Sequence, residues 1–165
     1  MDVKQYIRNR LKATRRENID KVIEYMEENS YFRKSCQHHH RYSGGLAEHA
    51  WQTYQIALYI RNEIIIQDRW SSSVDDDSIA ICAILHDLCN SDNMLDIRGH
   101  GRRSVQILER LGFKLKSDEF LAIRFHMGLH SKRTHPLYDE AKKCNLLAII
   151  HKADKQSAKL GNGCM

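Results

Sequence analysis

The feature that most constrains this fold is a histidine–aspartate doublet in an apolar run. His86 and Asp87 lie within Ile-Ala-Ile-Cys-Ala-Ile-Leu-His-Asp-Leu-Cys-Asn, residues 79–90, which predicts a buried helix. Burying an imidazole or a carboxylate without a partner costs several kcal/mol. A divalent metal ion compensates both groups at once. The chain must therefore fold so that further metal ligands reach the doublet.

Further ligands are present in separate segments that are expected to be helical. Three apolar segments each hold an isolated histidine, and an aspartate lies near the end of the chain: His49, His100, His126 and Asp154. Helix ends converge easily at one rim of a bundle, where inward-pointing side chains meet around a metal. This layout predicts a metal site assembled from scattered helices.

Adjacent residues on a helix point about 100° apart, so His86 and Asp87 flank a seam. Asp87 has two oxygens and can bridge two ions, whereas His86 binds one. We expect the first ion to be held by His49, His86, Asp87 and Asp154. His100 and His126 would hold a second ion that shares Asp87, or orient a phosphate.

A mixed imidazole and carboxylate shell suits divalent Fe, Mn, Zn, Co or Ni better than Ca or Mg. Two such ions roughly 3.5–4 Å apart clamp a phosphate and activate water as the nucleophile. The sequence leaves open whether one or two ions bind, and which metal it is.

Chain length and the low content of proline and glycine predict one all-α domain. The 165 residues suit a single core, and one proline with eight glycines favours long helices. We predict about six to eight helices in residues 1–165, with N-terminal helices in 1–30 and the site-bearing core in 39–160. The last helix is expected to run without a break from about 139 to 160.

Other bulk features bear on location and partners. No apolar run is long enough to span a bilayer, and the N-terminus has no signal-peptide core, which predicts a cytoplasmic protein without membrane contact. The odd count of five cysteines without a CxxC pair predicts reduced thiols. A net charge of +5 favours anionic ligands such as nucleotides or nucleic acid, although a solvated basic surface explains it equally well.

In combination, these motifs resemble the HD-domain phosphohydrolase superfamily. Its pattern is a histidine, a His-Asp doublet and a distant aspartate. Gly44-Gly45-Leu46-Ala47-Glu48-His49 is similar to the first-histidine motif, and 84–89 to the doublet helix. Gly99-His100-Gly101 and 124–128 resemble the extra-histidine segments of members with expanded sites, and Ala153-Asp154 resembles the closing aspartate.

The resemblance covers about His39 to Lys159 and implies an α-helical metal-dependent phosphohydrolase. Residues 39–49 also resemble the HD domain of certain bacterial 3′–5′ exoribonucleases.

The sequence departs from this family in two places. Many relatives carry a phosphate-contacting lysine three residues after the doublet aspartate, where this chain has Asn90. An amide does not replace an ammonium as a charge partner. Arginines near His100 are candidate replacements, because a guanidinium suits forked phosphate contacts: Arg98, Arg102 and Arg103. Lys152 and Lys155 flank Asp154 and offer the same two interpretations, phosphate contact or solvated surface.

The second departure is Met127, where relatives with elaborate two-metal sites have a second histidine after His126. His130 follows and is expected in a loop, and His151 is expected to pack rather than to ligate. His38, His39 and His40 are expected mainly in a loop, from which His39 or His40 reaches the rim of the site.

Two function classes follow. The first is an enzyme that hydrolyses a phosphate mono- or diester, such as a nucleotide or related small molecule, with metal-activated water. The alternative is a catalytically weakened HD-fold module that keeps the metal and binds a nucleotide or RNA. Asn90 supports the alternative, but no aromatic-rich stacking motif for RNA is present. The substrate and the oligomeric state are not specified by the sequence.

Overall fold

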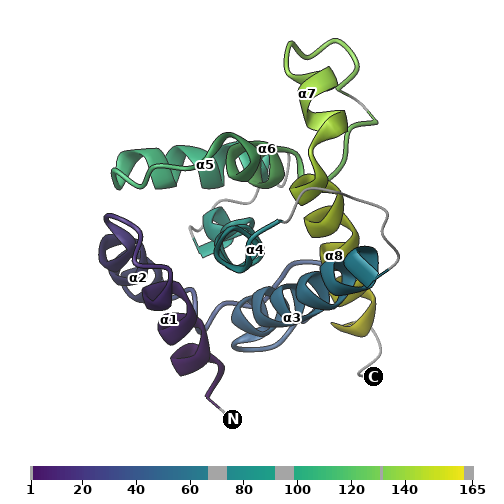
Figure 1. The fold of residues 1–165 in the computed structure, drawn as a ribbon. Coiled ribbons are helices and arrows are strands. Elements are labelled where there is room, and N and C mark those ends of the chain that lie inside the picture. The colour runs from purple at the N-terminus through teal and green to yellow at the C-terminus, as the bar shows by residue number, and fades with distance from the viewer. Residues whose placement is uncertain (1, 67–73, 92–98, 131, 162–165) are drawn as a thin grey trace.

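A computed structural model describes residues 2–66, 74–91, 99–130 and 132–161 of this protein (Figure 1). All regular structure in these residues is helical, which confirms the all-α prediction. The elements are α1 (Val3–Ala13), α2 (Ile19–Glu28), α3 (Gly45–Ile66), α4 (Asp76–Leu85), the 3₁₀ turn η1 (Leu88–Ser91), α5 (His100–Arg110), α6 (Ser117–Phe125), α7 (Tyr138–Lys143) and α8 (Asn145–Gly161).

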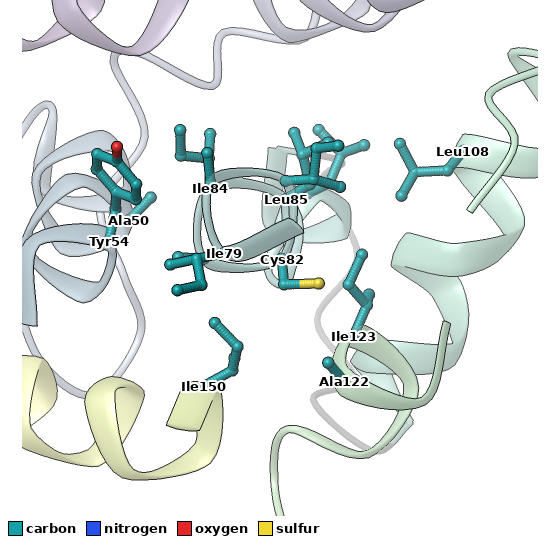
Figure 2. Close-up of a cluster of buried hydrophobic side chains, with 14 of the residues drawn as sticks. Ala50, Tyr54, Ile79, Cys82, Ile84, Leu85, Leu108, Ala122, Ile123 and Ile150 are labelled. Carbon is teal, nitrogen blue, oxygen red and sulfur yellow. The ribbon is translucent and has the colours of Figure 1, made fainter. Parts of the chain in front are cut away.

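Helix α4 is the centre of the bundle. Figure 1 shows it end-on, with α1 and α2, α3, α8, and α5 and α6 arranged around it. Every residue from Ser78 to Leu85 is buried, as expected for a helix that is apolar on all sides. In Figure 2 its side chains meet those of the surrounding helices, such as Tyr54 of α3, Ile123 of α6 and Ile150 of α8.

The end of α4 determines where the doublet lies. The α-helix ends at Leu85, His86 is its C-cap, and η1 follows directly. The chain thus changes from α to 3₁₀ geometry just after Asp87. Cys82 therefore lies on α4, whereas Cys89 lies in η1.

The last helical stretch is interrupted, contrary to the prediction of one continuous helix. α7 ends at Lys143, and Cys144 has extended backbone with ψ of 108°. The Cys144 thiol accepts a hydrogen bond from the Leu147 amide at 3.4 Å, which occupies one of the donors that the first turn of α8 leaves open. The break gives α8 a separate start and lets it pack along α3.

Among the residues that the structure describes, no helix combines the length and the apolar character that crossing a bilayer requires.

Candidate metal centre

Three side chains from distant helices meet at one end of α4. His49 comes from the first turns of α3, His86 caps α4, and Asp154 lies in α8. The His49 Nε2 atom is 3.1 Å from Asp154 Oδ1 and 3.3 Å from His86 Nε2. His86 Nε2 is 3.7 Å from the same carboxylate oxygen. Three of the ligands predicted for the first ion are therefore adjacent.

The hydrogen bonds on the far side of these imidazoles fix which nitrogen faces the cluster. His86 Nδ1 is 2.9 Å from the carbonyl oxygen of Ala83, which only accepts, so this nitrogen carries the proton. His49 Nδ1 is 2.9 Å from the Ser157 hydroxyl, which in turn donates to the His49 carbonyl at 3.2 Å. Both rings thus direct a lone pair on Nε2 into the cluster, as metal-bound histidines do.

A second pair of histidines lies beside the first group. The Nε2 atoms of His100 and His126 are 3.0 Å apart, and His126 Nδ1 donates to the Ile123 carbonyl at 2.8 Å. Gly101 permits this approach of α5 to α6, because a Cβ atom there would lie 2.5 Å from the Ile123 carbonyl oxygen. A side chain at position 101 would push His100 away from His126.

Asp87 lies between the two groups. Its Oδ2 is 3.6 Å from His86 Nε2, and its Oδ1 is 3.4 Å from His100 Nε2 and 3.5 Å from His126 Nε2. The carboxylate is 7% exposed, and Oδ1 is buried without a hydrogen-bond partner at normal distance. Each oxygen therefore faces one histidine group, as predicted for a carboxylate that bridges two ions.

The pKa values of the buried carboxylates and imidazoles in the site depend on burial and on one another. Burial alone would raise the pKa of Asp87, but His86, His126 and His100 outweigh it and hold that pKa well below its usual range. Burial likewise opposes ionisation of Asp154, yet the neighbouring imidazoles of His49 and His86 bring its pKa to about 2. Burial lowers the pKa of His86 to about 4, although Asp87 acts to raise it. Both carboxylates are thus anionic, and His86 is neutral, near pH 7.

These residues fit divalent metal ions. The Nε2 atoms of buried imidazoles converge with two buried carboxylates, and a divalent cation among them would compensate the carboxylate charge. Overlapping sets of candidate ligand atoms lie within 4.8 Å of one another: His49–His86–Asp87, His86–His126–Asp154 and Asp87–His100–His126. The structure therefore brings all six predicted ligands together. The donor set suits a transition metal and does not identify which one.

His39 and His40 lie next to this site, as predicted for its rim. The His40 Nε2 donates to Gln52 Oε1 at 3.0 Å, and its Nδ1 is 3.1 Å from Nδ1 of His39. Gly45 makes room for this segment, because a Cβ atom there would lie 1.9 Å from the His40 carbonyl oxygen. The rings of His39 and His49 are 4.4 Å apart. Burial, reinforced by His49 and His40, lowers the pKa of His39 to about 4.

A pocket of about 250 Å³ opens onto the centre. It is lined by three of the predicted ligands, Asp87, His100 and Asp154. Asn90 and Lys155 also line it. The site is therefore accessible to a small molecule from this side.

The predicted arginines lie elsewhere. Arg102 is exposed on α5 and Arg103 is half-buried, and neither lines the described pocket. Arg98 is outside the described residues. The role in phosphate binding predicted for these three residues stays a prediction.

His130 and His151 lie outside the cluster of candidate ligands, as predicted. His130 is exposed in a turn, and His151 donates from Nδ1 to the His126 carbonyl. His151 thus packs behind a ligand without joining it.

Sequence reasoning missed Ser157, which sets the orientation of His49. Ser157 is fully buried on α8, three residues after Asp154. Residues three apart on a helix share a face, so this spacing was the available signal. Nothing in the sequence indicated that its hydroxyl would meet His49.

Comparison with known proteins gives one match. The family model described as HD domain matches residues 46–159, more than two thirds of the chain and all six of the clustered residues. No curated protein and no solved structure matches this chain. The similarity of residues 39–49 to exoribonuclease HD domains stays a prediction.

Proposed function

Because the chain belongs to the HD-domain superfamily of metal-dependent phosphohydrolases, we propose that it hydrolyses a phosphate mono- or diester of a nucleotide or a related small molecule. This proposal rests on one observation: the two carboxylate oxygens of Asp87 face separate histidine groups. An arrangement of this kind suits two ions that clamp one phosphate.

The residues of the chain have distinct tasks in this reaction. His49, His86, Asp87 and Asp154 would hold the first ion, and His100, His126 and Asp87 the second. When bound, the ions polarise the phosphate and lower the pKa of the attacking water. Ser157 and the carbonyls of Ala83 and Ile123 keep the imidazoles in the tautomer and orientation that ligation needs.

The pocket supports a small substrate. Its volume of about 250 Å³ is at the small end of ligand sites, and beside the ligands it has Met127, Cys36 and Ala158 as apolar lining. Met127 is 64% exposed at this opening and offers a thioether surface on which a planar base can lie. These features favour a nucleotide over a polymer such as RNA.

The proposal includes a cytoplasmic location. The four cysteines in the described part of the chain, Cys36, Cys82, Cys89 and Cys144, are free thiols, as expected in a reducing compartment.

Elemental analysis combined with turnover tests this proposal. The protein is purified without chelator or affinity tag under low oxygen, and metal per chain is measured before nucleoside monophosphates and dinucleotides are screened for phosphate release. We expect about two ions per chain and turnover that Asp87→Asn removes. Glu119→Gln is the matched control, because Glu119 is a buried carboxylate outside the site. Full activity of Asp87→Asn would contradict the mechanism.

The alternative, a module that binds nucleotide without hydrolysing it, rests on Asn90, which lines the pocket where relatives have a lysine. The variant Asn90→Lys separates the two functions. A large gain from near-zero turnover favours the binding module, and robust wild-type turnover removes it. Steeply salt-dependent RNA binding would favour the RNA-binding form of the alternative.

A further inference from the structure

The pocket at the metal centre is lined by two carboxylates, those of Asp87 and Asp154. Its lining also includes Asn90, whose amide has no net charge. A phosphate ester that enters this pocket brings negative charge next to two carboxylates. Bound ions would offset part of that repulsion, and a protein cation would meet the remaining need for positive charge at the phosphate oxygens that face the opening.

One lysine meets this need from a different helix. Among the described residues, Lys155 of α8 is the only lysine or arginine that lines the pocket. It directly follows Asp154, and Ala158, three residues further on, lines the same pocket. α8 therefore contributes to one pocket wall both a predicted metal ligand and an ammonium group.

The contacts of the neighbouring carboxylate leave this ammonium available. Asp154 faces His49 at 3.1 Å and His86 at 3.7 Å. Within the described part of the chain, no carboxylate lies at ion-pair distance from Lys155, which is exposed at the pocket opening. Lys152, three residues before it on α8, is also exposed but does not line the pocket.

We infer that Lys155 is a substrate-binding residue whose ammonium holds a non-bridging oxygen of the substrate phosphate. It supplies from α8 the positive charge that Asn90 lacks on η1. The ligand class is a phosphate monoester or diester small enough for its phosphate to contact the ions and Lys155 together. This inference rests on the proposed function, since it assigns a residue to the same site.

Phosphate binding to the metal-loaded full-length protein tests this inference. Calorimetry with inorganic phosphate compares wild type, Lys155→Met and Lys152→Met, with metal content measured for each. We expect phosphate to bind roughly tenfold more weakly to Lys155→Met, and less than about twofold more weakly to Lys152→Met. Both variants remove one positive charge from α8, so the difference reports position and not net charge.

A second variant keeps the inference falsifiable. Asn90 and Lys155 line the same pocket, so Asn90→Lys in the Lys155→Met background returns an ammonium to it. We expect this double variant to recover most of the phosphate affinity. No recovery, in a double variant with wild-type metal content and melting temperature, would overturn the assignment. Equal losses at positions 152 and 155, or metal loss in Lys155→Met, would overturn it as well.

The outcomes separate this inference from the proposed function. If wild type binds metal and phosphate with the expected dependence on Lys155 but hydrolyses no ester, the hydrolase proposal fails and Lys155 stands. If wild type hydrolyses a nucleotide and Lys155→Met leaves both KM and phosphate affinity unchanged, the hydrolase proposal is supported and the assignment of Lys155 to phosphate binding is wrong.

Discussion

The two ends of α4 each hold a buried carboxylate in a polar cluster, and the clusters differ in one respect. Near the start of α4, Glu119 accepts hydrogen bonds from Arg16, from the Ser78 hydroxyl and from the Lys116 amide, each at 2.8 Å. At the other end, Asp87 faces three imidazoles at 3.4–3.6 Å, and its Oδ1 has no hydrogen-bond partner.

The supply of hydrogen-bond donors distinguishes a structural cluster from a functional one. A buried carboxylate that contributes only to the fold is provided with donors, because an unpaired buried charge is costly. At this end of α4, His86 and His126 direct their Nδ1 protons to backbone carbonyls and His49 directs its own to Ser157, so the Nε2 atoms of these three rings face the buried carboxylates. A divalent cation would complete such a cluster.

The largest effect is expected from Asp87→Asn. The amide keeps the shape of the carboxylate but removes the charge that faces both histidine groups, so both ions should be lost. Because metal ions supply several kcal/mol of transition-state stabilisation, turnover should fall by at least about a thousandfold. Steady-state kinetics with metal analysis measures it. Glu119→Gln should retain metal and turnover, and equal metal loss in both variants would remove the contrast.

The reciprocal change, Glu119→Ala, should act on stability. It leaves Arg16, Ser78 and the Lys116 amide without their acceptor, and breaking a buried pair of this kind costs about 3 kcal/mol. Chemical denaturation measures the free energy of unfolding. Metal per chain should stay at the wild-type value, because Ser78 and His86 are about 12 Å apart along α4. A loss of metal in this variant would show that the two clusters are coupled.

The third prediction concerns pH in the metal-free protein. The pKa of His86 is about 4 when folded, against an ordinary value of 6.5. Between these values the unfolded chain binds the additional proton, so the stability that neutral His86 contributes is complete above pH 6.5 and is lost as pH falls towards 4. His39, with a pKa of about 4, acts in the same direction.

We expect the free energy of unfolding to drop by about 2 kcal/mol from pH 7 to pH 4.5 after chelation. Urea denaturation at each pH measures it. The raised pKa of His126 acts in the opposite direction, but its stabilising contribution is complete below pH 6.5, so it offsets only the part of the drop between pH 7 and pH 6.5. His86→Asn should have a shallower pH dependence, and an unchanged slope would show that another group is responsible.

The smallest effect is expected from Ser157→Ala, which removes the acceptor for the His49 Nδ1 proton. Outer hydrogen-bond partners of metal ligands are worth about tenfold or more in affinity. Metal affinity should therefore fall roughly tenfold, as measured by competition with a chelator. Thr53→Val is the control, because Thr53 donates to the His49 carbonyl without touching its ring. Equal losses in both variants would indicate general loosening of α3.

The sequence predicted the structure correctly where the local pattern of apolar and polar residues determines it. The apolar run before His86 predicted a buried helix, and α4 is buried throughout. Isolated histidines in apolar segments predicted ligands from separate helices, and all six candidates meet. The uninterrupted last helix was wrong, since Cys144 leaves helical geometry and its sulfur caps α8. A thiol as an N-terminal acceptor has no clear sequence signal.

By itself, therefore, the sequence determined the helical class, the residue types of the metal centre and the family to which the chain belongs. Burial costs and helical periodicity act within a few neighbouring residues, and a sequence displays them directly. Only the tertiary structure decided that the two oxygens of Asp87 face different histidines, and that Ser157 holds His49. It also decided that Lys155, and neither Arg102 nor Arg103, lines the pocket. These relations depend on how α3, α5, α6 and α8 pack around α4, and side-chain direction between distant segments is fixed only by that packing.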